Sequence, residues 1–585
     1  SKLLYGSLLS TVMLTLLFTH PYLGLIGTLF LLFFWLIKWL FEIKKRIYLI
    51  LMGTVAVLPI VLFKLFATFS DDHVNRSNEP GGFFSLYGNW RSVFRPLISP
   101  LNDFFNTLGI DGVKLETTAY IGSGMTLLLI LAIILLFLKR KQYTWKNIKH
   151  SNLFKFSLAA FFLLLFSFCI PFKFEWAKPI LDYVSPLKQF RALGRFAWVF
   201  YYVVSVVTVI LLFKVINQKN KIWIIAIFFL GLVINGYEAA HLHSIKAKKM
   251  AKKENIFKKE HLNSDQIKLV DYLKSKNYQA FLFLPATHLS SEYLYMTSDE
   301  KSELDAQLIS YHSKLPMLNS ATSRMSLDEA FKFNNLFGPY YSEKKFFDDI
   351  PSNDRIVIIT NEVKPRDFEL SIINRSLKID SFGIYSVYEF RQVNFESSSE
   401  FHSIKEHFQN DALQEKLGWR LNDSSSFIYY NDFSDTKNKY YLSPDGSYEN
   451  IKHEWNTIKT FDRSMIPLGK YKLSFWFYLG VDKPAVLAVI QQKYTDHGAW
   501  SDQIQISRSN HIVENWCFTE LDVIITEDTE SFDLLLTCGG NNKPFIIDDL
   551  LIRPSSVDVY KTMEVNGKQY LNFNNHLLNW NSFTK

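Results

Sequence analysis

The chain has 585 residues, three cysteines, a formal net charge of +8 and a mean hydropathy of +0.03. Three cysteines exclude a disulfide-rich scaffold. Much of the positive charge lies in short loops beside apolar segments, which is a membrane-topology signal, so we expect no nucleic-acid partner. The mean hydropathy averages an apolar first 240 residues and a polar remainder, and this predicts a membrane part followed by water-soluble domains.

Seven long apolar runs occupy the first 240 residues. They are Leu3–Thr19, Pro21–Leu40, Ile47–Phe66, Thr118–Leu138, Leu153–Phe172, Arg195–Ile216 and Ile222–Ala240. Each approaches the ~20 helical residues that cross a hydrocarbon core of ~30 Å. We therefore expect residues 1–240 to form a transmembrane bundle of seven helices. The first run begins without Met and lacks signal-peptide features, so we expect the bundle to be truncated at its N-terminus.

Lysine and arginine concentrate in alternate connections between these runs. The basic connections are 44–46, 139–149 and 214–221. The positive-inside rule places these three in the cytoplasm. The loops 67–117 and 173–194 then face outward, and residues 241–585 follow on the same extracytoplasmic side.

The loop 67–117 is rich in aromatic side chains and arginine. Trp90 is followed by Arg91 and Arg95. Such a segment suits an interfacial helix that anchors the protein to membrane lipids. It also suits a pocket for a sugar on a phosphorylated lipid, because rings stack on sugar faces and arginine binds phosphate through two hydrogen bonds.

Two further arginines, Arg191 and Arg195, stand four residues apart where the sixth run begins. At this spacing we expect them on one face of the first helical turn. A helix N-terminus is unfavourable for cations, so an anionic partner such as a lipid phosphate would explain them. Non-specific headgroup contact by snorkelling side chains is the alternative.

Three segments of this membrane part carry a resemblance. They are His20-Pro21-Tyr22-Leu23, the stretch from Glu116 to Gly122 that includes Ala119-Tyr120-Ile121-Gly122, and Phe190-Arg191-Ala192-Leu193-Gly194-Arg195-Phe196-Ala197-Trp198. They resemble the later spans of bacterial polytopic membrane proteins with the GT-C glycosyltransferase architecture, and the resemblance covers about residues 1–330.

The resemblance implies an inner-membrane protein that takes a sugar from a polyprenyl-phosphate donor on the periplasmic side. It implies a substrate pocket and a lipid-phosphate site formed by residues of the loops. The pocket residues would be His20, Trp90, Glu116 and Tyr120, and the phosphate residues would be Arg91, Arg95, Arg191 and Arg195. The family's acidic catalytic motif precedes the segments matched here, so no catalytic residue is assigned.

Residues 262–393 alternate helical and strand patterns, with a strand at 280–284 and others at 355–360 and 384–390. We expect a small extracytoplasmic α/β domain. From about residue 415 the pattern changes to short strands separated by Gly, Asn, Asp and Pro, which predicts an antiparallel β-sandwich over 415–555 and a C-terminal extension over 556–585. The expected fold class is thus multi-domain.

The sandwich resembles jelly-roll carbohydrate-binding modules, in its order of elements and in its closing strand, residues 545–552. The resemblance implies a glycan or polysaccharide partner and exposed aromatic rings, for which Tyr494, Trp500 and Trp516 are candidates. Trp476 alternates within an apolar strand and is expected in the core. Asp548 and Asp549 are candidates for structural Ca²⁺, the one divalent cation considered, or for a turn or capping role. We expect residues 425–555 to fold alone.

Cys517 and Cys538 lie in the same predicted domain, where a disulfide and two buried free thiols are both open interpretations. Two functions fit the whole pattern. One is a glycosyltransferase-like envelope protein, and the other is a non-catalytic membrane protein that binds or helps assemble surface polysaccharide.

Overall fold

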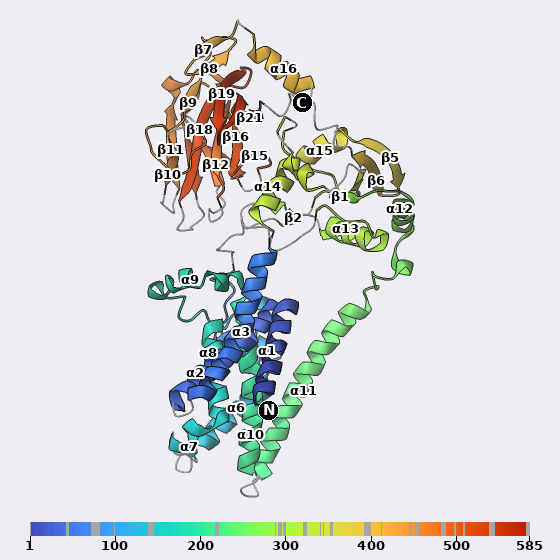
Figure 1. The fold of residues 1–585 in the computed structure, drawn as a ribbon, viewed down its shortest axis with the longest axis vertical. Helices are drawn as coiled ribbons and strands as arrows, with labels where there is room; N and C mark the ends of the chain where they lie inside the picture. The colour runs from blue at the N-terminus through green and yellow to red at the C-terminus, as the bar shows by residue number, and fades with distance from the viewer. Residues whose placement is uncertain are drawn as a thin grey trace. The chain divides into compact units, whose positions relative to one another are not determined.

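The structure is a computed structural model. It describes residues 2–42, 46–71, 82–98, 100–138, 145–216, 222–286, 288–289, 295–296, 300–319, 325–339, 341–342, 344–350, 355–390, 399–410, 412–443, 446–450, 455–480, 487–495, 499–506, 509–537 and 544–580. The chain divides into two compact units (Figure 1). The membrane unit comprises Ser1–Asp72 and Asn78–Glu254, and the second unit contains Asn255–Lys585.

Every predicted apolar run forms a helix in the membrane unit. The long helices are α1 (Lys2–Thr19), α2 (Pro21–Phe41), α3 (Arg46–Ser70), α6 (Ser123–Leu138), α8 (Asn152–Ser167), α10 (Trp198–Ile216) and α11 (Ile222–Ala251). Within the described residues, four segments are long and apolar enough to cross a membrane: Pro21–Phe41, Leu49–Ser70, Leu193–Lys214 and Ile222–Ala251. The chain is therefore a membrane protein. The apolar helices in α1, α6 and α8 are shorter, so a bundle of seven spans stays a prediction.

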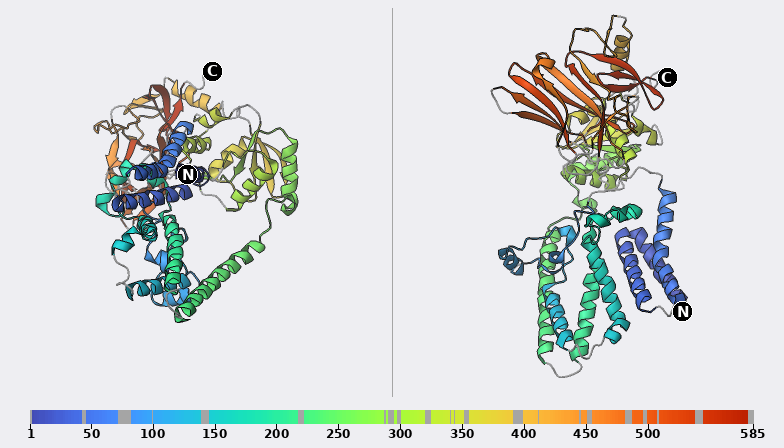
Figure 2. Two further views of the ribbon diagram at one scale, coloured as in Figure 1. Left: turned by 60° about the horizontal axis from the view of Figure 1, so that its bottom comes forward. Right: turned by 90° about the vertical axis from the view of Figure 1, so that its left-hand side faces the viewer.

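Helix α8 lies at the centre of this unit, between two groups of helices (Figure 2). Leu163 belongs to a core shared with α1 and α2, whereas the next residue, Leu164, belongs to a core with α6, α10 and α11. Adjacent positions on a helix point in different directions, so a helix that is apolar all round is buried by neighbours on both sides. At one end of α8, Lys155 is fully buried and forms an ion pair with Glu42, which follows α2.

The first part of the second unit is a three-layer α/β arrangement. Its sheet has the order β1 (Ala280–Leu284), β4 (Ile356–Thr360), β6 (Tyr385–Phe390) and β5 (Leu377–Phe382). Strands β1 and β4 are parallel, and the other pairs are antiparallel. Alternate residues of β1 enter different cores, one with α12 (Ser264–Ser275) and α13 (Glu300–Ser313), the other with α14 (Leu327–Leu336) and α15 (Asp367–Asn374).

The C-terminal part has three β layers. The central sheet contains β9 (Tyr429–Asn431), β10 (Tyr448–Asn450), β12 (Gly469–Tyr478), β15 (Ile512–Val513), β16 (Trp516–Ile525) and β18 (Phe545–Pro554). One face packs on a sheet of β11 (Asn456–Asp462), β17 (Thr529–Thr537), β13 (Leu487–Tyr494) and β14 (Trp500–Gln505). These two sheets confirm the predicted antiparallel sandwich after a helical bundle.

A third sheet covers the other face of the central sheet. It contains β7 (Gln414–Lys416), β8 (Trp419–Leu421), β19 (Val559–Val565), β20 (Lys568–Phe573) and β21 (His576–Asn579). The segment predicted as a C-terminal extension, 556–585, thus contains three strands, and β19 pairs with β8. The burial of β18 shows why this third layer is needed: residues Phe545–Arg553 of this strand are all buried. A strand buried at odd and even positions must be covered on both faces.

Helix α14 joins the α/β and β regions into one unit. Leu327, Ala330 and Phe331 belong to the core of the sandwich, whereas Phe333 and Leu336 belong to a core of the α/β sheet. A capping box between Ser326 and Glu329 fixes its first turn. The last turn lies close to the segment before β15, because a Cβ on Gly338 would be 2.4 Å from the Asn510 carbonyl oxygen.

Candidate functional site

The outward-predicted loops of the membrane unit are held together by backbone hydrogen bonds. The Gly194 N–H donates to the Leu86 oxygen (3.2 Å), and the Gly88 N–H donates to the Ser167 oxygen (2.8 Å). The residues around α4 (Trp90–Phe94) and those before α6 are joined in the same way, by the Ala119 N–H and the Ser92 oxygen (3.0 Å). These loops therefore form a layer of fixed structure at one end of the helices.

Within this layer, three side chains gather around Tyr22. The four residues are called here the Tyr22 cluster: His20, Tyr22, Phe190 and Arg195. The Arg195 guanidinium lies over the Tyr22 ring, 4.9 Å from its centre. Phe190 meets the same ring edge-on at 5.1 Å, and the exposed His20 lies 6.2 Å away. The Tyr22 hydroxyl accepts a hydrogen bond from the Ala192 N–H (2.9 Å). The ring thus orients one cation and positions the backbone of the Arg191–Arg195 segment.

Two close approaches place further residues beside this segment. A Cβ on Gly82, whose φ is +115°, would be 2.8 Å from the Arg191 Cβ, and one on Gly194 would be 2.5 Å from Thr117 Cα. Both positions need the absence of a side chain. The short helix that contains Glu116, η2 (Leu115–Thr117), is therefore packed against the Arg195 segment, and Glu116 itself is exposed.

The helical placement predicted for the two arginines is wrong. Arg191 lies between the 3₁₀ helices η4 (Ser185–Gln189) and η5 (Leu193–Ala197), and Arg195 lies in η5, ahead of α10. The spacing of four residues therefore does not put them on one α-helical face, and the helix-dipole argument does not apply to them. One segment of the chain carries both arginines, and the Arg195 guanidinium lies beside Tyr22.

The other predicted phosphate residues differ from these two. Arg95 is buried, and its Nε and Nη2 donate to the Ile110 oxygen (2.9 Å) and the Asn106 Oδ1 (2.5 Å). It holds the loop around α5 (Leu101–Thr107) rather than presenting a free guanidinium. Arg91 is exposed on α4. Trp90 is half exposed and packs edge-on against Phe168, with 5.0 Å between ring centres, outside the Tyr22 cluster.

Tyr120 is engaged by an acid that the sequence analysis did not select. Its hydroxyl donates to the Glu238 Oε1 (2.8 Å), and the other oxygen of Glu238 accepts from the Ser123 N–H at the start of α6 (2.9 Å). Glu238 is buried on α11. The sequence did offer a sign of this role, because Glu238 is an acidic residue inside the apolar run Ile222–Ala240. Here the carboxylate caps α6, so both residues have a structural role in this arrangement.

The three aromatic candidates in the sandwich are not gathered on an exposed face. Trp516 is 4% exposed, because the third sheet covers it, and its ring packs against Tyr478. It therefore lacks the exposure expected of a sugar platform. Tyr494 is half-buried at the end of β13. The side chain of Trp500 lies outside the described residues. Trp476 is fully buried, as expected, and its Nε1–H donates to the Asn575 oxygen (2.9 Å).

Asp548 and Asp549 are completely buried in β18, and three of their four carboxylate oxygens accept hydrogen bonds from protein groups, whereas Asp549 Oδ2 accepts none within the described part of the chain. Asp548 accepts from the backbone N–H of Leu442 (2.7 Å), Ser443 (3.0 Å) and Asp549 (2.8 Å). Asp549 accepts from the hydroxyls of Ser443 (2.6 Å) and Tyr430. Burial, and for Asp548 also the charge of its neighbour, raises the pKa of both carboxyls. The three backbone N–H groups that donate to Asp548 support the capping role, and calcium binding stays a prediction.

We expect Asp548→Ala to lower the free energy of unfolding by at least about 2 kcal/mol, because three buried N–H groups lose their acceptor. Thermal or denaturant unfolding with excess Ca²⁺ and with a chelator measures this. The loss should be equal in both conditions, and the exposed Glu530→Ala should serve as a neutral control. A wild-type protein that Ca²⁺ stabilises and Asp548→Ala renders insensitive would restore the metal interpretation.

A second buried polar pair, also absent from the sequence analysis, lies where β21 meets the segment before β15. The Nδ1 atoms of His511 and His576 are 2.9 Å apart, and the rings stack at 5.0 Å. Trp476, Phe518 and Tyr341 surround them. Burial lowers the pKa of His576 to about 3, and Arg553 and Lys472 add to this. Burial, His576 and Lys344 lower the pKa of His511.

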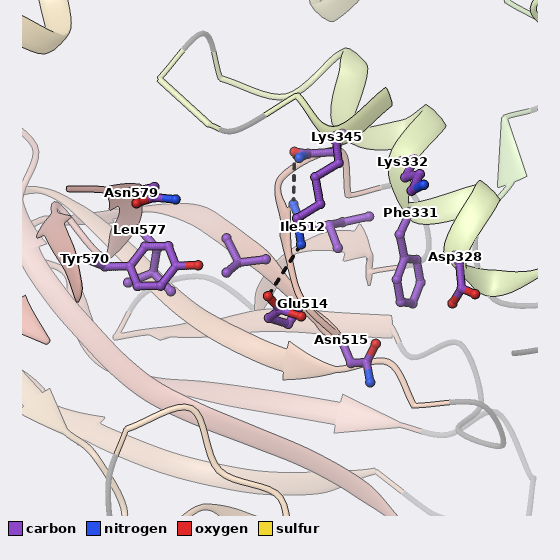
Figure 3. A pocket seen from close by; sticks show the side chains of 12 residues that line it. Asp328, Phe331, Lys332, Lys345, Ile512, Glu514, Asn515, Tyr570, Leu577 and Asn579 are labelled. Carbon is purple, nitrogen blue, oxygen red and sulfur yellow. Dashed lines mark hydrogen bonds and ion pairs between the residues drawn. The ribbon is translucent and has the colours of Figure 1, made fainter. Parts of the chain in front are cut away.

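Ile512 and Leu577, which directly follow these two histidines in the chain, line a pocket of about 340 Å³ in the second unit (Figure 3). One wall is α14, and the other consists of the turn between β15 and β16 with residues of β20 and β21. Lys345 and Glu514 meet across it, with 3.4 Å between Nζ and Oε1. No residue of this pocket was selected by sequence, because its walls are far apart along the chain.

Comparison with known proteins adds the following. Residues 4–235 match a family model described as "Domain of unknown function (DUF6311)". No curated protein matches the chain. Among solved structures, "Family 16 Carbohydrate Binding Module-2" is 9% identical, with 23% of this chain and 89% of that chain covered and a TM-score of 0.16. "Structure of TmCBM61 in complex with beta-1,4-galactotriose" is 15% identical, with 24% and 90% covered and a TM-score of 0.15. TM-scores this low assign neither a fold nor a ligand to this chain.

The structure gives the state of two of the three cysteines. Cys169 and Cys517 are buried free thiols. Cys538 lies outside the described residues. Cys517 faces the sandwich core, and burial raises the pKa of its thiol, so it behaves as a small apolar side chain there.

Proposed function

We propose that this chain is a glycosyltransferase-like membrane protein of the bacterial cell envelope. In this proposal, it binds a polyprenyl-phosphate-linked sugar at the extracytoplasmic face of the inner membrane, and the Tyr22 cluster with Arg191 holds the phosphate. The supporting observation is the placement of the Arg195 guanidinium, which stands over a tyrosine ring in a layer of ordered loops at one end of apolar helices. Among the described residues, Arg195 takes part in no ion pair.

The chemistry of the cluster suits a lipid phosphate. A guanidinium stays charged at any biological pH and binds phosphate oxygens through two parallel hydrogen bonds. The Tyr22 ring restrains Arg195, so less side-chain entropy is lost when an anion binds. The exposed His20 adds an imidazole ring whose nitrogens donate or accept hydrogen bonds. The adjoining Glu116 is exposed beside the same segment and is available to the sugar end of the ligand.

Binding of a polyprenyl monophosphate to the full chain in nanodiscs tests this proposal, with the corresponding polyprenol as the phosphate-free comparison. Losing one charge-assisted contact costs about 1.5–3 kcal/mol, which is about a 10- to 150-fold weaker affinity. We expect Arg195→Lys and Arg191→Lys to weaken phosphate binding by this factor. Lys114→Gln, an exposed cation of the same loops, should leave it unchanged.

Two outcomes would contradict the proposal. Equal affinity for the phosphate and the alcohol would show that the prenyl chain alone is bound. Wild-type affinity in both arginine variants would make these side chains ordinary membrane-interface anchors.

The second candidate function is non-catalytic binding or assembly of surface polysaccharide. The polar pocket of the second unit supports this binding function, because a saccharide could bind there without any reaction at the membrane unit. A transfer assay with a radiolabelled polyprenyl-phosphate sugar, the full chain and an envelope polysaccharide as acceptor separates the two functions. Transfer of the labelled sugar to an acceptor hydroxyl, with release of polyprenyl phosphate, supports the first, and polysaccharide binding without transfer supports the second.

A further inference from the structure

The pocket in the second unit is built on one face of α14. Asp328, Phe331, Lys332 and Asn335 all line it. These positions are spaced by three, one and three residues, so they project from the same side of a helix. Figure 3 shows Asp328, Phe331 and Lys332 on the helix, with Glu514 and Asn515 opposite. The pocket is thus a defined groove between a helix and a β-turn.

Both walls of the pocket are fixed before any ligand arrives. Phe331 is part of the sandwich core, so α14 cannot move away from the sheets without opening that core. The Ile512 N–H lies 3.5 Å from the Asn335 Oδ1, which connects the two walls directly. The Leu479 N–H donates to the Asn515 oxygen (2.7 Å) and holds the turn. A preformed site loses little conformational entropy on binding.

The charges that line the pocket compensate one another. Two are acidic, Asp328 and Glu514, and two are basic, Lys332 and Lys345. Lys345 pairs with Glu514, and Lys332 pairs with Asp349 at 2.8 Å. Lys568 approaches Glu514 from the other side at 3.7 Å. A phosphate or a polyanion would meet as many negative as positive groups, so the pocket does not favour an anionic ligand.

The remaining lining combines an amide with apolar side chains. Asn515 is exposed and carries both a donor and an acceptor, whereas Tyr570, Ile512 and Phe331 line the pocket with apolar atoms. A sugar has the matching character, because its hydroxyls need paired donors and acceptors and its C–H faces pack on apolar side chains. From this combination we infer that the pocket binds a short neutral saccharide. This site is separate from the Tyr22 cluster and does not depend on the lipid-phosphate proposal.

Saturation-transfer difference NMR on the full chain tests the inference, in a zwitterionic detergent without a sugar headgroup. The probes are maltotriose, cellotriose, triacetylchitotriose and β-1,4-galactotriose, with trigalacturonate as the anionic comparison. We expect at least one neutral trisaccharide to bind at millimolar or lower concentration. Lys345→Ala and Asn515→Ala should each weaken that binding at least fivefold. Lys493→Ala, an exposed lysine that pairs with Asp533 on another sheet, is the matched control.

Three results would overturn the inference. They are no binding of any neutral probe, undiminished binding in both pocket variants, and tighter binding of trigalacturonate than of every neutral trisaccharide. Thermal unfolding of each variant separates loss of the site from loss of the fold. Arg195→Lys should retain saccharide binding, so failure of the lipid-phosphate proposal would leave this result intact.

Discussion

Acidification from pH 6 to pH 4 should remove about 2.5 kcal/mol of stability from residues 255–585 through His576 alone. The unfolded chain has a histidine pKa of about 6.5, whereas burial holds the folded pKa of His576 at about 3. Between these two pKa values His576 is protonated in the unfolded state and neutral in the folded state, so the free energy of unfolding falls as the pH falls. His511 acts in the same direction, because its pKa is also lowered. A charge on either ring would face the other ring, with Lys344, Lys472 and Arg553 nearby.

The comparison between variants isolates this effect. The raised pKa values of Asp548 and Asp549 act in the opposite sense, because a folded carboxyl that binds protons more tightly stabilises the fold in acid. Denaturant unfolding of residues 255–585 at pH 6, 5 and 4 should therefore be measured for wild type and His576→Gln. The variant should lose about 2.5 kcal/mol less than wild type over this range. His402→Gln, at an exposed histidine, should follow wild type. If the free energy of unfolding fell equally with pH in wild type and His576→Gln, the lowered pKa of His576 would be contradicted.

Residues 425–555 expressed alone should fail to fold cooperatively, whereas residues 255–585 should fold. This reverses the expectation from sequence, for a physical reason. The short fragment lacks β8 and β19–β21, so one face of the central sheet, with Trp476, Trp516 and Ile546, is uncovered. It also lacks Phe331 of α14, which completes the sandwich core.

The expected loss of stability is comparable to the total stability of a typical domain. Full burial of each large apolar side chain contributes about 1.5–3 kcal/mol, and domains are stable by about 5–15 kcal/mol. Near-ultraviolet circular dichroism and urea titration of both fragments measure the difference. A sharp urea transition in 425–555, at the midpoint seen for 255–585, would show that the third sheet is dispensable.

The sequence predicted the elements of this chain better than their partners. Each apolar run became a helix, and strands such as β12 and β18 lie within or close to their predicted ranges, because hydrophobic periodicity is a local property. The third sheet was missed because its packing on β18 joins strands that are paired by long-range contacts, which no local pattern records. Two runs of consecutive apolar residues in β18, Phe545–Ile547 and Leu550–Ile552, were a local sign that both faces of this strand are covered.

The candidate sites show the same limit. Tyr22 was noticed only as part of a motif, yet its ring organises Arg195 and the Ala192 backbone. Arg95 looked equivalent to Arg91 in the sequence, but Arg95 is buried and its guanidinium is hydrogen-bonded to Ile110 and Asn106, whereas Arg91 is exposed. Residue type indicates which chemistry is available, and burial and partners decide whether that chemistry is free to act.

The double coverage of the central sheet also sets an order of events during synthesis. Strand β8 pairs with β19, so its partner is made only near the end of the chain. Until β19–β21 emerge, the apolar face of β12, β16 and β18 has no cover, and unpaired apolar strands are prone to aggregate. Pairing between segments this distant is also slow, since a long loop must close first. We therefore expect the nascent chain to expose this apolar face until residues 559–579 are made, and products that terminate before residue 559 to be prone to aggregation.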